Sequence, residues 1–148
     1  DTRYPQIAAT FFLLGIGMGL TMAPSTTAVM DAIPHSKAGV GSATNDASRE
    51  VGGALGIAIG GSVLNEIYQS TIIIPASASG QSGLIQESFP AAITIGQRML
   101  ELGNPEGAEL IASARESFIE GMIAACIVAG VVALLAAIIV KWKLPHDD

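Results

Sequence analysis

The sequence is poor in charge, and this scarcity limits what the chain can be. Only 14% of its 148 residues are Asp, Glu, Lys or Arg, whereas 50% are hydrophobic. A soluble domain carries roughly a quarter charged residues, so the composition favours a membrane protein. Basic residues are the scarcer class, with 7 against 13 acidic residues and a net charge of −6. We therefore expect no nucleic-acid partner, because binding phosphate requires a basic surface.

Other shortages argue against catalysis. The single cysteine, Cys126, has no partner for an internal disulfide. The two histidines, His35 and His146, are far apart and have no further ligand at metal-site spacing. No Ser, His and Asp constellation can be recognised in the sequence. We expect no enzyme, no metal site and no cofactor.

Long apolar segments are abundant, and three of them predict membrane spans. Residues 7–30 contain no charged residue and give about 36 Å of helix, enough to cross a hydrocarbon core of about 30 Å. Residues 39–68 are long enough only if the polar part, 42–50, faces protein or water. Residues 118–140 end at Lys141-Trp142-Lys143, a basic and aromatic anchor typical of a membrane boundary.

The polar stretch 69–117 separates the last two spans. It begins with a Ser-, Gly- and Pro-rich linker, 75–83, and continues with helical patterns at 91–102 and 106–115. Gly103-Asn104-Pro105 divides the two patterns. We expect a helical hairpin outside the membrane, with a solvated loop of marginal helices as the alternative.

Lysine positions predict the orientation of the spans. Lys37 lies in the turn 31–38 and two further lysines lie in the tail 141–148, whereas the loop 69–117 has two arginines against five glutamates. Basic residues near span ends favour the cytoplasm, so the C-terminus is expected there. The chain is then divided as follows: 1–38, a transmembrane helix and a cytoplasmic turn; 39–68, a glycine-rich transmembrane helix; 69–117, an extracytoplasmic loop; 118–148, the final helix and a cytoplasmic tail.

Glycines recur every four residues in the second span, at Gly52, Gly56 and Gly60. Small residues at this spacing let a second helix approach closely in a bilayer. The contact could be static, or it could move during transport. Gly15 and Gly19 in the first span are interpreted in the same way, since no strand precedes them and no Walker lysine follows.

Three ionisable residues precede this glycine stripe. Asp46 and Glu50 are one helical turn apart, and Arg49 is spaced to neutralise Asp46. Ionisable residues at membrane depth suggest function, here the exchange of a proton for a cation. The alternative is that all three are solvated at the membrane interface and end the helix there.

The run Gly-Val-Gly-Ser-Ala-Thr-Asn-Asp-Ala-Ser-Arg-Glu-Val-Gly-Gly-Ala-Leu-Gly, 39–56, resembles the penultimate helix of fourteen-span drug:proton antiporters of the major facilitator superfamily, EmrB/QacA branch. The preceding segment, with Gly15, Pro24 and Pro34, is similar to that family's twelfth span. The long loop before a final helix also fits this branch.

The resemblance implies an all-α integral membrane fold: three transmembrane helices of a major facilitator fold, spans twelve to fourteen, with an extracytoplasmic helical hairpin. The chain would be a fragment of a proton-coupled multidrug efflux transporter in a bacterial inner or plasma membrane. Its partners would be a lipophilic, often cationic substrate, protons, membrane lipid and the remaining N-terminal spans. Asp46 and Glu50 would be the coupling acids, with Arg49 as their partner.

The sequence is also compatible with a protein that is not a transporter. A free-standing small membrane protein could oligomerise through its glycine stripe and transport nothing. Three spans alone are not expected to enclose a central cavity. The sequence upstream of Asp1 would separate the two readings.

Overall fold

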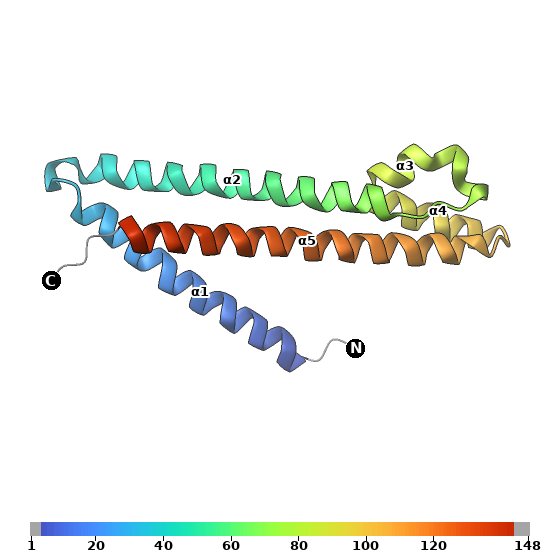
Figure 1. The fold of residues 1–148 in the computed structure, drawn as a ribbon, viewed down its shortest axis with the longest axis horizontal. Helices are drawn as coiled ribbons and strands as arrows, with labels where there is room; N and C mark the ends of the chain where they lie inside the picture. The colour runs from blue at the N-terminus through green and yellow to red at the C-terminus, as the bar shows by residue number, and fades with distance from the viewer. Residues whose placement is uncertain (1–3, 144–148) are drawn as a thin grey trace. The chain divides into compact units, whose positions relative to one another are not determined.

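The computed structural model describes residues 4–143, and every regular element in this part of the chain is a helix (Figure 1). The elements are α1 (Tyr4–Asp31), η1 (His35–Lys37), α2 (Ala38–Thr71), η2 (Ala76–Gln81), α3 (Ser82–Glu87), α4 (Phe89–Glu101) and α5 (Glu106–Lys143). Three of the helices, α1, α2 and α5, are long and apolar enough to cross a membrane. The coarse expectation of an all-α protein with three such helices is confirmed. The chain divides into two compact units, Asp1–Gly53 and Ala54–Asp148.

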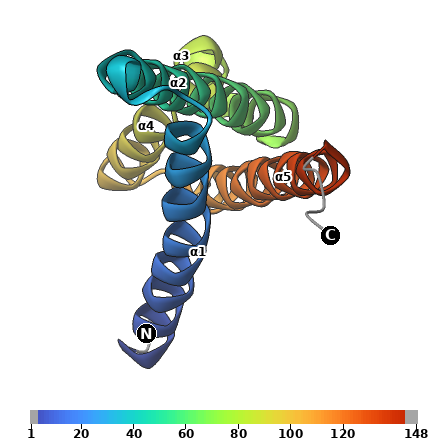
Figure 2. The ribbon, with the colours of Figure 1, turned by 90° about the vertical axis from the view of Figure 1, so that its left-hand side faces the viewer.

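The first unit contains α1 and the beginning of α2. Helix α1 is drawn as one unbroken helix (Figure 2). It includes Pro24, although proline has no N–H to donate to the carbonyl of Leu20. Hydroxyls around this point donate to backbone carbonyls one turn back, including Thr21 to Gly17 O at 2.8 Å and Thr26 to Met22 O at 2.9 Å. These hydroxyls therefore form their hydrogen bonds within the helix and need no hydrogen-bond partner outside it.

A tight turn joins α1 to α2. Pro34 starts η1, and Lys37 N donates to Pro34 O at 2.8 Å. Gly41 is buried here, and a Cβ at that position would collide with the Ile33 side chain. Gly41 thus permits the close return of the chain after the turn.

The second unit has a small core near one end of its long helices. We call residues 68–121 the compact region. Its buried apolar side chains come from the end of α2, from η2, α3 and α4, and from the first half of α5: Tyr68, Ile72, Ala78, Ile85, Ala92, Leu110 and Ala114. Helix α4 lies along the N-terminal half of α5 (Figure 1).

Aromatic side chains and one buried hydroxyl complete this core. Phe89 stacks on Phe118 with ring centroids 4.5 Å apart, and Tyr68 meets the edge of Phe89 at 6.4 Å. The Tyr68 hydroxyl donates to Ile85 O at 2.9 Å. Burial of a phenol is tolerated when its O–H has such a partner. These contacts bind the end of α2 to α3 and α4.

The turn between α4 and α5 follows the local sequence. Gly103 has a φ of 80°, a left-handed conformation that favours glycine at the end of a helix. Asn104 Oδ1 then accepts from Glu106 N at 3.0 Å and caps the start of α5. At the other end of α4, Ser88 Oγ accepts from Ala91 N.

The helices of the compact region differ from the expectation in two places. The second helix of the expected hairpin does not end at Arg115, because α5 is continuous from Glu106 to Lys143 and includes the third span. At about 1.5 Å per residue α5 is about 57 Å long, so it extends beyond a hydrocarbon core of about 30 Å. The expected linker 75–83 is mostly helical, as η2 and the start of α3.

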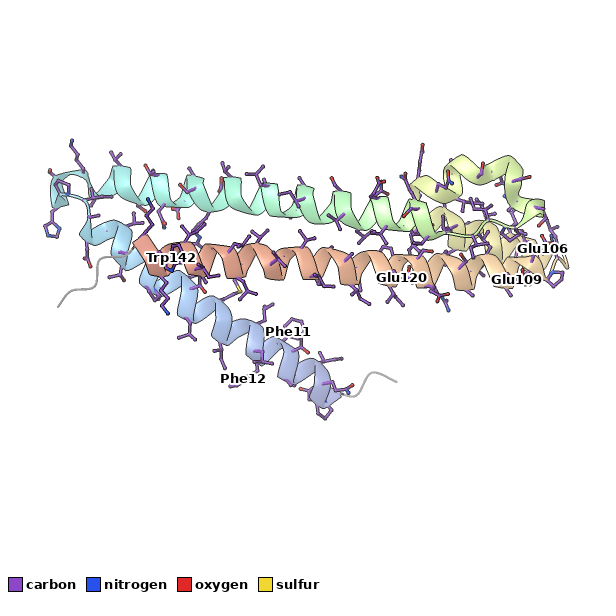
Figure 3. All side chains as sticks on the ribbon, in the orientation of Figure 1. Phe11, Phe12, Glu106, Glu109, Glu120 and Trp142 are labelled. Atoms are coloured by element: carbon purple, nitrogen blue, oxygen red, sulfur yellow. The ribbon has the colours of Figure 1, made fainter. Side chains whose placement is uncertain are left out.

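The apolar windows of the three long helices bury little within the chain. The buried share is 0% in α1, 6% in the window that covers η1 and α2, and 0% in α5. Phe11 and Phe12 of α1 and Trp142 of α5 project from the ribbon (Figure 3) and are between 70% and 84% exposed. These faces are available to lipid or to other helices.

Candidate functional site

The three ionisable residues predicted as a site lie on the first half of α2. Asp46, Arg49 and Glu50 are all exposed. The nearby Thr44 and Ser48 hydroxyls donate to carbonyls one turn back, Val40 O at 2.9 Å and Thr44 O at 2.8 Å. Both hydroxyls therefore form hydrogen bonds within the helix. The two carboxylates and the guanidinium are the charged groups of this surface.

The guanidinium of Arg49 contacts α1 and does not pair with the acids. Its Nη2 lies 3.8 Å from Met22 Sδ. Across residues 4–143 it forms no ion pair with Asp46 or Glu50, so the expected Asp46–Arg49 pair is not made. The reason is local: Met22 and Arg49 both belong to the first unit, where α1 comes close to α2. Arg49 thereby connects the two helices.

Two carboxylates one turn apart on an exposed face can each take up a proton or attract a cation. In the described part of the chain no group of three or more His, Cys, Asp or Glu is arranged to hold a metal ion. Proton or cation exchange at Asp46 and Glu50 stays a prediction.

The glycines singled out in the sequence lie on open helix surfaces. Within residues 4–143, a Cβ built at Gly52, Gly56 or Gly60 meets no atom within 4 Å apart from its own helix backbone, and the same holds for Gly15 and Gly19. Their role in helix packing stays a prediction.

Other glycines, not singled out by the sequence pattern, lie in close contacts between helices. A Cβ at Gly107 would collide with Gly96 O and lie 2.9 Å from Met99 Cβ, and a Cβ at Gly96 would lie 2.6 Å from Ile111 Cγ1. Gly121 lies against α2, because its Cβ would be 2.7 Å from Leu64 O.

The positions of the small residues in α5 indicate these contacts. The buried positions of α5 follow alternating intervals of three and four residues: Gly107, Leu110, Ala114, Ser117 and Gly121. This is the spacing of a helix-packing seam, here filled mostly by small residues. Small residues give little hydrophobic signal, so the seam is easily overlooked.

Sequence comparison relates the chain to drug-resistance proteins. It is 28% identical over 135 residues to the multidrug efflux pump LfrA of Mycolicibacterium smegmatis, covering 90% of this chain and 26% of LfrA. It is 32% identical over 142 residues to the methyl viologen resistance protein SmvA of Salmonella typhimurium, covering 93% and 28%. It is 30% identical over 149 residues to the multidrug resistance protein Stp of Mycobacterium tuberculosis, covering 91% and 26%.

The chain spans about a quarter of the length of these curated relatives. No family model matches it. No solved structure matches it either. Its homologues are thus proteins named for multidrug efflux and drug resistance, at modest identity, and its span-length helices fit a membrane protein of that kind.

Proposed function

We propose that this chain is the C-terminal, three-span part of a proton-coupled multidrug exporter of the major facilitator superfamily, corresponding to spans twelve to fourteen of the EmrB/QacA branch. The substrate class is lipophilic compounds, often cationic, which leave the cell in exchange for protons. The chain would act together with N-terminal spans that precede it in the complete transporter.

The observation that carries the proposal is similarity along nearly the whole chain to only a quarter of each relative. At least 90% of the chain aligns with proteins named for efflux or resistance. The unburied span helices support the same interpretation, because a major facilitator protein surrounds such helices with others. The open faces at Gly52, Gly56 and Gly60 supply the small-residue surface that such packing needs.

Asp46 and Glu50 are the proposed coupling acids. The expected pairing of Arg49 with Asp46 would have left Glu50 as the main proton carrier. Since Arg49 contacts Met22, that ground for preferring Glu50 is lost, and both acids are candidates. Arg49 would position the acids by holding α2 against α1.

The proposed topology places the turn 31–38 and the C-terminal tail in the cytoplasm and 69–117 outside. Of the tail 141–148, residues 144–148 lie outside the described part. In a cysteine-free background with Cys126→Ala, Ser79→Cys should react with an impermeant maleimide in intact cells, and Ser36→Cys should react only after the membrane is opened. Labelling of Ser36→Cys from outside would reverse the assignment.

The transport proposal is tested with the complete protein that contains this chain. In a strain without its own multidrug pumps, expression should lower the accumulation of a fluorescent lipophilic cation, and a protonophore should restore it. A matched strain carrying the empty vector is the control. Unchanged accumulation despite verified membrane expression would contradict the proposal.

A second candidate is a small membrane protein that oligomerises through the glycine stripe without transport. The open surface at Gly56 favours it as well, since a second copy could occupy that surface. Crosslinking through cysteines at Gly56 separates the two cases. Products between copies, with no efflux, would support the oligomer.

A further inference from the structure

The uncharged stretch of α5 locates one edge of the hydrocarbon core of the membrane. Residues 121–140 contain no charged residue and lie between Glu120, which is marked in Figure 3, and Lys141. A helix of this length is about 30 Å long, which matches the thickness of a hydrocarbon core. The edge of the core on the side of the compact region therefore lies at about Gly121.

Helix α2 places this edge at the same height. A Cβ at Gly121 would lie 2.7 Å from Leu64 O, so the two helices are in contact at this level. The uncharged part of α2, 51–65, ends at Glu66, just beyond Leu64. Glu66 and Glu120 are both exposed. Charged residues are rare inside the core, so their appearance at one height on two adjacent helices is expected where both helices leave it.

The junction between α3 and α4 lies just outside this edge. Phe118 is about 5 Å beyond the edge along α5, and the ring of Phe89 stacks on it with centroids 4.5 Å apart. Tyr68 is about 6 Å beyond the edge along α2, and its hydroxyl donates to Ile85 O at 2.9 Å. Each headgroup layer of a bilayer is about 5–8 Å deep. The two contacts therefore hold the junction at the height of the headgroups.

The side chains of this junction suit such a position. Leu84 is 60% exposed, and Pro90, in the first turn of α4, is exposed as well. Gln86 and Glu87, which lie between them in the sequence, are also exposed. In a headgroup layer the apolar side chains reach the acyl boundary, while the polar side chains and the backbone amides stay in contact with water.

The far end of the compact region provides a comparison. Leu102, 81% exposed, lies at the turn between α4 and α5. Helix α5 begins at Glu106, about 22 Å beyond Gly121 along the helix. Leu102 is therefore an exposed leucine of the same region that lies well outside the headgroup layer.

We propose that the junction of α3 and α4 rests on the lipid bilayer, with Leu84 and Pro90 inserted at the boundary between headgroups and acyl chains. The partner is the lipid of the leaflet on the side of the compact region. This contact continues the lipid-facing surface of the span helices beyond the hydrocarbon core. The inference goes beyond the proposed function and requires only that α2 and α5 cross the membrane.

The test measures the depth of single fluorescent labels in the complete protein, reconstituted into phosphatidylcholine vesicles. Leu84→Cys and Leu102→Cys, each in a cysteine-free background with Cys126→Ala, are labelled with bimane. A phosphatidylcholine that carries a nitroxide near its headgroup should remove about half of the fluorescence at position 84, because a label inserted at the acyl boundary lies within about 10 Å of that nitroxide. Fluorescence at position 102 should be unchanged.

A second reporter and a second quencher sharpen the measurement. Pro90→Cys should behave like Leu84→Cys, and it keeps the test valid if a change at Leu84 disturbs α3. Iodide, which stays in water, should quench in the opposite order, most strongly at position 102. A nitroxide at the end of the acyl chain should quench positions 84 and 90 less than the nitroxide near the headgroup does.

Several results would overturn the proposal. Equal lipid quenching at positions 84 and 102 would show that the two ends do not differ in height. Quenching of positions 84 and 90 by iodide alone would place the junction in water. Protection of both positions from every quencher would show that other spans of the complete protein cover the junction. The labels report depth whether or not the protein exports drugs, so this proposal and the proposed function can fail separately.

Discussion

In the compact region, a Cβ added at Gly107 would meet backbone atoms of α4. One added at Gly56 on α2 would meet nothing within 4 Å in the described part of the chain, apart from its own helix backbone. Gly107 permits a close contact between α4 and α5. Gly56 lies on an open helix surface. This difference separates a region that is folded by its own residues from helices that need a surrounding protein or lipid.

The two regions also differ in what their polar groups do. In the compact region the Tyr68 hydroxyl is paired with Ile85 O inside a buried core. On α2 the carboxylates of Asp46 and Glu50 are exposed. A buried hydrogen bond of the first kind supports folding. Exposed acids on a span-length helix contribute little to folding, and they are candidates for the coupling role proposed above.

The largest effect is expected from a change in the glycine stripe of α2, formed by Gly52, Gly56 and Gly60. Gly56→Leu should abolish efflux by the complete protein, because a branched side chain would exclude a neighbouring helix that the glycine admits. Drug accumulation in cells is the readout, with membrane expression checked by immunoblot. Gly56→Ala, which adds one methyl group, is the control and should retain part of the activity. Normal efflux in Gly56→Leu would show that this surface faces lipid.

The next largest effect is expected on the free energy of unfolding, from a change at a glycine that contacts another helix. Gly107→Ala should destabilise the compact region by about 2 kcal/mol, because the new methyl group meets backbone atoms that cannot move aside easily. Hydrogen exchange of α4 amides should become faster. Gly53→Ala, with nothing within 4 Å, is the control and should leave this exchange unchanged. Equal protection in both variants would mean that the α4–α5 contact is looser than described.

A smaller effect is expected at the buried hydroxyl. Tyr68→Phe should cost about 1–2 kcal/mol, since Ile85 O loses its donor inside the core. Thermal unfolding in detergent can measure this loss. Tyr4→Phe, at a residue 82% exposed, should have no measurable effect. A stable Tyr68→Phe variant would show that water replaces the hydroxyl.

The sequence predicted the long helices better than the contacts between them. Uncharged length alone indicated α1, and the turn at Gly103-Asn104-Pro105 was recognisable from its residue types. The continuity of α5 was missed, because the polar residues around Arg115 resemble the end of a helix when its packing against α4 is unknown.

The candidate site was predictable only in part. The positions of Asp46 and Glu50 on one helix follow from their spacing. The contact of Arg49 with Met22 does not, because it depends on how α1 and α2 meet across the turn at Pro34. The seam at Gly107 and Gly121 was overlooked because glycine contributes no apolar signal.

Drug-driven proton movement would show whether Asp46 and Glu50 couple transport to protons. The complete protein is reconstituted into vesicles, and proton flux is followed with a pH-sensitive dye when a lipophilic cation is added. We expect flux in the wild type and its loss in Glu50→Gln, in Asp46→Asn, or in both, with Glu87→Gln unchanged as the control. If both variants keep wild-type proton-coupled transport, these acids are solvated interface residues and do not couple transport to protons.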